Sequence, residues 1–261
     1  MQATMRPAAP TRTIGDEVAA TLRRIALVVV ASGIAGALVG GIGSRAVMRI
    51  AAIVAPEARG LLTENGNVVG EFTVAGTIGL LIFAGIASAV AGAGVFVLTD
   101  PWLPRRTVAR GLVLGGILLA LFGSAVVDPA NADFVLLGNR ALNVAMFSGL
   151  FLGFGLVASG GLAALDRRVP AASTFSPRAW SLAFVLAVPA LLGIVGVAFG
   201  TGSRLGLLLV AARGVLVAAC MLERRGSFGV ARVIRAAATA TLIAVVGIAG
   251  ATYVDAVATI L

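Results

Sequence analysis

Long apolar runs alternate with short polar segments along the whole chain. Seven runs approach the length of about 20 residues that a helix needs to cross a hydrocarbon core of roughly 30 Å. They cover residues 25–43, 74–98, 111–127, 141–164, 181–199, 205–222 and 236–257. We therefore predict an all-α integral membrane protein whose single domain, residues 18–261, is a bundle of about seven transmembrane helices.

Residues 1–17 contain Pro and Thr and show no periodic apolar face. Such a segment cannot bury enough apolar surface to fold alone, so we predict a disordered cytoplasmic tail. The first apolar run does not read as a signal peptide, because Asp16 and Glu17 interrupt the basic segment before it and six more runs follow.

Composition agrees with a membrane location and excludes several kinds of chemistry. Hydrophobic residues make up 59% of the chain and charged residues 12%, whereas about 25% of a soluble domain is charged. There is no His and one Cys, so this chain alone cannot build a His-ligated haem or a Cys/His zinc site. A retinal Schiff base is excluded because it needs a lysine. We predict no cofactor and no metal site.

The net charge of +9 comes from 20 arginines and no lysine. These arginines lie in short clusters between apolar runs, which is typical of topology determinants and not of a nucleic-acid surface. With the N-terminus inside, fourteen arginines fall in the cytoplasm and five outside. We therefore predict that the N-terminus is inside and the C-terminus outside.

Asparagines and acids gather in the first two outer connections, around residues 44–73 and 128–140. We predict that these connections form a small polar cap on the outer face, which we call the outer cap. Its candidate binding residues are Arg45, Arg49, Glu64, Asn65, Asn67, Glu71, Asp128, Asn131, Asp133 and Arg140.

The first connection has two parts. Arg45 and Arg49 are four residues apart, so they share one face of a helix that either lies at the interface or extends the first span. That pair either snorkels as a membrane anchor or binds a ligand. Asn65-Gly66 predicts a type I′ hairpin turn. The oxygen-rich residues around it suit a hard cation, but their spacing does not match an EF-hand loop.

The second connection begins with an Asp-Pro turn at residue 128. Its carboxylates would either pair with Arg45, Arg49 or Arg59 and lock the two connections together, or lie in a solvated loop.

Two charges fall within later spans, Arg213 in the sixth and Asp255 near the outer end of the seventh. Since an ionisable residue within a membrane is a functional candidate by default, we weigh three roles for Arg213. They are an ion pair with Asp255, a contact with a ligand or lipid headgroup, and simple snorkelling.

Small residues recur four apart inside the spans and permit close helix contacts, within one chain or in a homo-oligomer. These motifs are Gly36-x-x-x-Gly40, Ala84-x-x-x-Ser88-x-x-x-Gly92, Gly111-x-x-x-Gly115 and Gly149-x-x-x-Gly153. Two other segments, VLTDPWLPRR and LAALDRRVP, each end a span with an acid, a proline and paired arginines. We interpret both as stop signals at the inner face.

Two polar segments occur together in this sequence: residues 44–77 (SRAVMRI…EARGLLTENGNVVGEFTVAGT) and residues 128–147 (DPANADFVLLGNRALNVAMF). This pairing resembles an uncharacterised family of polytopic membrane proteins from actinobacteria, over roughly residues 25–170. The resemblance implies a bacterial plasma membrane, carries no known activity and implies nothing about a substrate.

Three classes of function remain. The leading hypothesis is a non-enzymatic membrane module whose outer cap binds a partner protein, a lipid headgroup or a small polar ligand. The first alternative is a small-molecule transporter with a site near Arg213, and the second is an intramembrane enzyme that uses outer-face carboxylates. A binding module predicts no continuous cavity beneath the outer cap, and a transporter predicts a pocket near the midplane, close to Arg213. An enzyme predicts two carboxylates that converge in a cleft, at least one of them with a perturbed pKa.

Overall fold

The computed structural model of the chain describes residues 13–56, 60, 74–130, 139–172, 175–200, 204–224 and 226–261. Seven helical stretches in these ranges are long and apolar enough to cross a membrane, as in a multi-pass membrane protein, and the same ranges contain no strand. The predicted all-helical bundle is confirmed at this level. The predicted hairpin around Asn65 lies outside the described residues, and the predicted orientation stays a prediction.

The first helix begins earlier than the sequence suggested. Thr13 and Asp16 form a capping box, in which the Asp16 amide donates to the Thr13 hydroxyl (3.2 Å) and the Thr13 amide donates to the Asp16 carboxylate (2.9 Å). Residues 14–17, which we had assigned to the disordered tail, are therefore helical.

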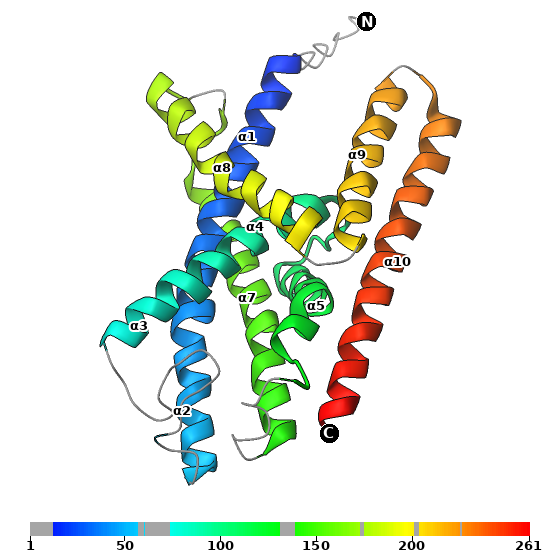
Figure 1. Cartoon of the computed structure of the whole chain (residues 1–261). Coiled ribbons are helices and arrows are strands. Elements are labelled where there is room, and N and C mark those ends of the chain that lie inside the picture. Colours follow the sequence, from blue (N-terminus) through cyan, green and yellow to red (C-terminus); the bar gives the residue numbers. More distant parts are fainter. Residues whose placement is uncertain are drawn as a thin grey trace, which may run out of the picture.

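The first span is one long helix in three parts. α1 (Ile14–Ala35) continues through the π-helical η1 (Gly36–Gly43) into α2 (Ser44–Val54), and the stretch Gly15–Val54 has 40 residues (Figure 1). Of the two alternatives for the Arg45 segment, the structure shows the extension of the first span.

The second span also contains a π-helical segment. It consists of α3 (Val74–Leu80), η3 (Leu81–Ile86) and α4 (Ala87–Thr99), and it ends in the 3₁₀ turn η4 (Asp100–Trp102). The two π segments pack against each other. A Cβ added to Gly36 would lie 2.3 Å from the carbonyl oxygen of Gly85, so only glycine permits this approach.

Five longer helices complete the bundle. They are α5 (Thr107–Val126), α7 (Arg140–Arg168), α8 (Pro177–Gly200), α9 (Leu205–Arg224) and α10 (Phe228–Ile260). α8 runs obliquely past α1 and α4, and α9 and α10 form a hairpin beside α5 (Figure 1). The core, with Phe96, Leu114 and Leu162 almost fully buried, lies between α1, α4, α5 and α7.

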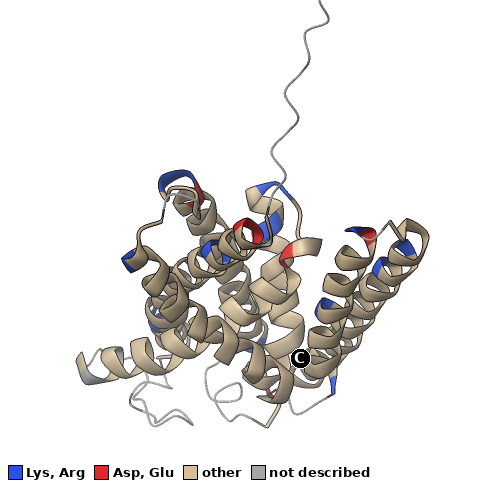
Figure 2. Ribbon diagram, turned by 90° about the horizontal axis from the view of Figure 1, so that it is seen from above, with Lys and Arg blue, Asp and Glu red and all other residues tan. Residues whose placement is uncertain are grey.

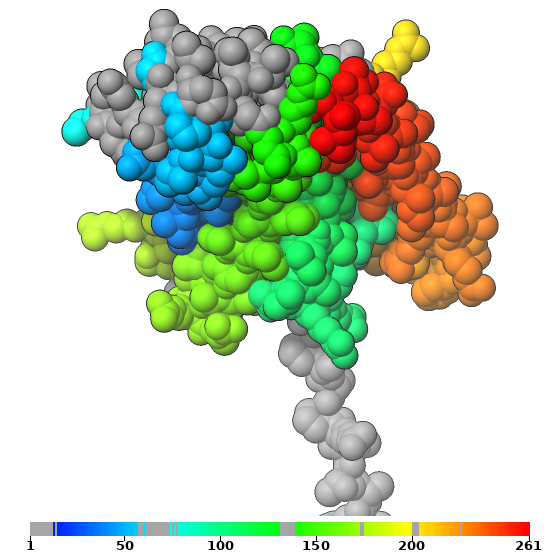
Figure 3. Space-filling model, turned by 90° about the horizontal axis from the view of Figure 1, so that it is seen from below, coloured from blue at the N-terminus to red at the C-terminus, as the bar shows by residue number. Residues whose placement is uncertain are grey.

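Charges lie mostly near the ends of the helices, and the helix bodies carry few of them (Figure 2). We name the two ends of the bundle by their arginines. The Arg23 end holds the first half of α1, the ends of α4 and α7 and the α9–α10 connection (Figure 1). At the Arg45 end, α2, the start of α7 and the end of α10 lie side by side (Figure 3).

Small residues bring helix backbones together, as the sequence motifs predicted. Gly111 and Gly115 of α5 face Gly155 of α7, where an added Cβ would lie 2.2 Å from the Gly111 carbonyl oxygen. Gly149 differs, because nothing lies within 4 Å of an added Cβ at that position. Gly149 therefore makes no close helix contact with the described residues, and an added Cβ at Gly153 would be in ordinary contact with Val39.

Two neighbouring glycines of α5 test this packing. We expect Gly115→Ala to destabilise the protein by about 1–3 kcal/mol, since its Cβ would overpack the helix contact. That Cβ would lie 2.7 Å from the Cα of Leu152. Gly116→Ala meets nothing within 4 Å and should be neutral or slightly stabilising, because Ala favours a helix more than Gly does. Thermal unfolding in detergent compares the two, and equal losses would contradict this account.

Candidate functional site

A cavity of about 380 Å³ lies between η1, the η3–α4 segment, α5 and α7. Its wall combines large aromatic rings from α5 and α7 with small residues from η1, η3 and α4. The rings are those of Phe122, Phe147, Phe151 and Phe154, and the small residues are Gly40, Ala84, Ala87, Ser88, Ala91 and Gly92. Ser44, the first residue of α2, lines it as well, so the cavity reaches toward the Arg45 end.

The polar groups in the cavity wall are not available to a ligand. Its two hydroxyl groups are bonded to their own helices, since Ser88 donates to the carbonyl of Gly85 (3.1 Å) and Ser44 donates to the carbonyl of Gly40. Gly92 leaves room for Phe154, whose ring atom Cζ would lie 2.2 Å from an added Cβ. Such a wall suits a hydrocarbon chain and offers no donor hydrogen to a polar ligand.

Arg45 and Arg49 differ sharply although both were predicted to lie on one face. Arg45 is only 6% exposed, and its Nε and Nη2 atoms are buried and have no hydrogen-bond partner among the described residues. Arg49 is exposed. A helical turn separates them, but packing covers the first and leaves the second open. Arg45 therefore does not snorkel into solvent.

Two other predicted cap residues have local structural roles. A carboxylate oxygen of Asp128 accepts from the Ala130 amide (2.9 Å), which forms the predicted turn. Arg140 donates to the carbonyl of Ile260 (3.2 Å) and joins the start of α7 to the end of α10. Glu64, Asn65, Asn67, Glu71, Asn131 and Asp133 lie outside the described residues, as does Arg59, so the outer cap stays a prediction.

The structure does not bring Arg213 and Asp255 together. α10 has 33 residues and α9 has 20, and Arg235 bonds to Glu223 close to the turn between them. Arg213 therefore faces α10 near residue 240, and Asp255 lies roughly 20 Å further along that helix. In the described ranges Arg213 makes no ion pair or hydrogen bond, and the acidic group in electrostatic range is Asp100. The sequence prediction failed because it placed the outer ends of the two helices at one level, whereas α10 is 13 residues longer than α9.

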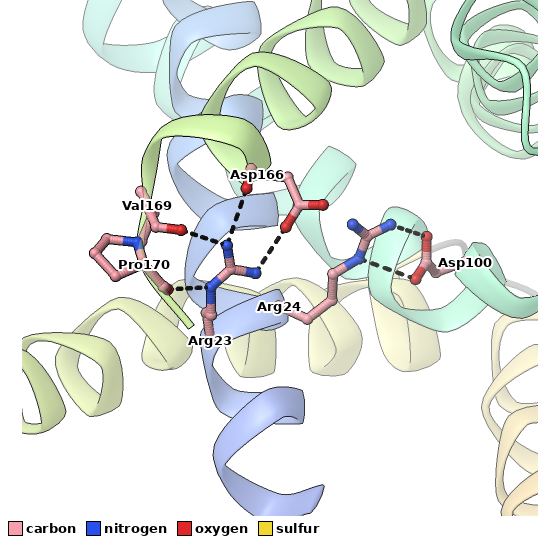
Figure 4. Close-up of polar contacts among 6 residues, drawn as sticks. All are labelled: Arg23, Arg24, Asp100, Asp166, Val169 and Pro170. Carbon is pink, nitrogen blue, oxygen red and sulfur yellow. Dashed lines mark hydrogen bonds and ion pairs between the residues drawn. The ribbon is translucent and has the colours of Figure 1, made fainter. Parts of the chain in front are cut away.

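The Arg23 end contains polar contacts that the sequence argument missed. The Arg23 guanidinium donates to the Asp166 carboxylate (2.7 Å) and to the carbonyls of Val169 (2.7 Å), Pro170 (2.8 Å) and Asp166 (3.2 Å) (Figure 4). These are acceptors at and just after the C-terminal end of α7, where a cation is favourable because the last carbonyls lack helical partners. Arg23 thus fixes α7 to α1.

The next residue, Arg24, performs the same task for α4. Its Nη2 and Nε atoms donate to the two carboxylate oxygens of Asp100 at 3.0 and 3.3 Å (Figure 4). Asp100 and Asp166 are the acids of the two segments that we interpreted as stop signals. We call the four side chains Arg23, Arg24, Asp100 and Asp166 the arginine clamp. In the sequence, the segments VLTDPWLPRR and LAALDRRVP and the adjacent arginines 23 and 24 were the features that could have predicted it.

Tyr253 ties α10 to α7 near the aromatic side of the cavity. Its hydroxyl lies 2.5 Å from the hydroxyl of Ser148, which itself donates to the carbonyl of Val144. Because a serine hydroxyl has one hydrogen, Tyr253 is the donor in this pair. Gly123 of α5 makes room for the ring, since an added Cβ would lie 2.6 Å from Tyr253 Cδ2.

Comparison with protein-family models, with curated proteins and with solved structures finds no match to this chain. The resemblance to an actinobacterial family therefore stays a prediction.

The arginine clamp predicts a clear difference between two arginines. We expect Arg23→Ala to lower stability by about 2–3 kcal/mol, because it leaves a carboxylate and three carbonyls without their charged donor. Arg224→Ala should cost less than about 1 kcal/mol, since its pair with Glu17 is largely exposed. Thermal unfolding of both variants in the same detergent provides the measurement. Losses of similar size would show that the clamp is an ordinary surface ion pair.

Proposed function

We propose that this protein is a non-enzymatic membrane protein that holds a lipid chain in the cavity between η1, α4, α5 and α7. The observation that carries the proposal is the cavity itself, about 380 Å³ in volume, with aromatic and small apolar side chains around it. This volume lies in the range of about 300–1,000 Å³ that is typical of small-molecule sites. The bacterial plasma membrane is part of the same proposal.

The cavity changes the leading hypothesis. A module that binds only at its outer cap predicts no continuous cavity beneath the cap, yet a cavity is present and Ser44, at the start of α2, lines it. We therefore place the apolar part of the ligand in the cavity and keep binding, without chemistry, as the function. A membrane lipid is the ligand class that fits, because it reaches such a site from within the bilayer.

The two alternatives have less support. Arg213, which the transporter alternative places at its centre, lines neither this cavity nor two further cavities of about 440 and 330 Å³. The carboxylate of Asp128, which the enzyme alternative would use, bonds to its own turn. The described residues contain no group of three or more Cys, Asp or Glu side chains that could hold a metal.

A photoreactive lipid tests the proposed function. We expect a phospholipid with a diazirine on one acyl chain to label α7 between Phe147 and Phe154. Ala91 lines the cavity, so Ala91→Phe should fill part of it and lower labelling at least tenfold. Ala244→Phe is the control, because Ala244 is exposed on α10 and lines none of the three cavities. Peptide mass spectrometry locates the label, and label spread evenly over the lipid-facing helices would contradict the proposal.

A further inference from the structure

Arg45 stands apart from the arginines that the structure pairs. Arg23 and Arg24 bond to acids of the arginine clamp, Arg140 bonds to a carbonyl, and Arg235 bonds to Glu223. Arg45 is more deeply buried than the side chains of the clamp, yet no carboxylate in the described ranges forms an ion pair with it. A buried charge without a partner is strongly unfavourable, so the position calls for an anion.

The unpaired atoms define which kind of partner would fit. Nε and Nη2 lie on one edge of a guanidinium group, and both are buried and unbonded in Arg45. Arg24 uses this same edge to bind both carboxylate oxygens of Asp100. Two parallel N–H groups match two oxygens of one carboxylate or phosphate. The empty edge of Arg45 therefore fits an oxyanion that binds through two oxygens.

Arg45 does not line the cavity, but it is the next residue in the chain after one that does. Arg45 follows Ser44, which lines the cavity where η1 passes into α2. A ligand with its chain among the phenylalanines would have its polar end near the start of α2. Hydrocarbon alone gains little by leaving the lipid for such a cavity, because lipid chains are as apolar as the wall. A polar contact is needed to select one lipid over another.

We propose that Arg45 binds the phosphate group of an anionic lipid whose chain occupies the cavity. The inference rests on the proposed function for the chain and adds the class of headgroup and the residue that recognises it. Arg45 acts as a binding residue and takes no part in a reaction.

The test compares three probes on the full-length protein, stripped of lipid in a neutral detergent. The probes are dioctanoyl phosphatidic acid, dioctanoylglycerol and inorganic phosphate, which separate the phosphate from the chain. Native mass spectrometry and the shift in thermal unfolding report binding. We expect phosphatidic acid to bind at least tenfold more tightly than dioctanoylglycerol, and inorganic phosphate to bind more weakly than phosphatidic acid.

Two substitutions at Arg45 test whether its guanidinium group selects the phosphate. Arg45→Met removes an unpaired buried charge, so the lipid-free protein should unfold at a higher temperature while the preference for phosphatidic acid disappears. Arg45→Lys keeps the charge but has no two-donor edge, so the preference should fall several-fold without vanishing. Arg232→Met is the control, because Arg232 is exposed on α10 near the opposite end of the bundle, and it should keep the preference.

The outcomes separate the two proposals. If neither lipid binds, the cavity is not a lipid site and the proposed function fails together with this inference. If both lipids bind equally to the unaltered protein, the cavity proposal stands and the role of Arg45 is overturned. If inorganic phosphate binds as tightly as phosphatidic acid, the site takes a free anion and the lipid headgroup is overturned. An unchanged preference in Arg45→Lys would overturn the two-oxygen contact.

Discussion

The attachment of α4 and α7 to adjacent arginines of α1 is the constraint on which the rest of the structure depends. Arg23 and Arg24 project in different directions from one helical turn, so they hold α7 and α4 on two sides of α1. Close glycine contacts then continue along the bundle, between Gly36 and Gly85 and between Gly111 and Gly155. The first and second spans form one fixed pair of helices, and α5 and α7 form the other. The size of the side chains then determines the space between these two pairs. It is filled around Phe96 and Leu114 and is left open beside Phe122 and Phe147.

Apolar periodicity and length predicted the helices well because both measure the transfer of side chains into hydrocarbon. They did not predict where the helices begin. α10 begins at Phe228 and α1 at Ile14, each several residues before the apolar run that we identified. Helices continue for as long as their backbone groups find partners, and arginines or a capping box allow this outside an apolar run. The difference in length between α9 and α10 then placed Arg213 and Asp255 far apart.

The candidate site was predictable only in part for a similar reason. Sequence composition singled out Arg45 and Arg49 as polar residues on an apolar helix, but it could not distinguish them. Their difference arises from tertiary packing, which covers Arg45 and leaves Arg49 exposed. The cavity was invisible in the sequence because its wall consists of ordinary span residues. Asp100 and Asp166 were visible as a repeated acid–proline pattern, yet their partners on α1 depend on the packing of α4 and α7 against it.

The two ends of the bundle differ in whether their buried arginines form ion pairs within the chain. At the Arg23 end the guanidinium groups of Arg23 and Arg24 each meet an acid of the same chain, so these two charges are satisfied by folding alone. At the Arg45 end a more deeply buried guanidinium has no such acid among the described residues. A chain that needed charge only for stability would gain by replacing Arg45 with an apolar residue, since an unpaired buried charge opposes folding. An arginine with two unpaired buried nitrogens, next in the chain to a residue of the cavity wall, is explained if an anionic ligand supplies the partner, and this asymmetry is the physical basis of the proposed lipid site.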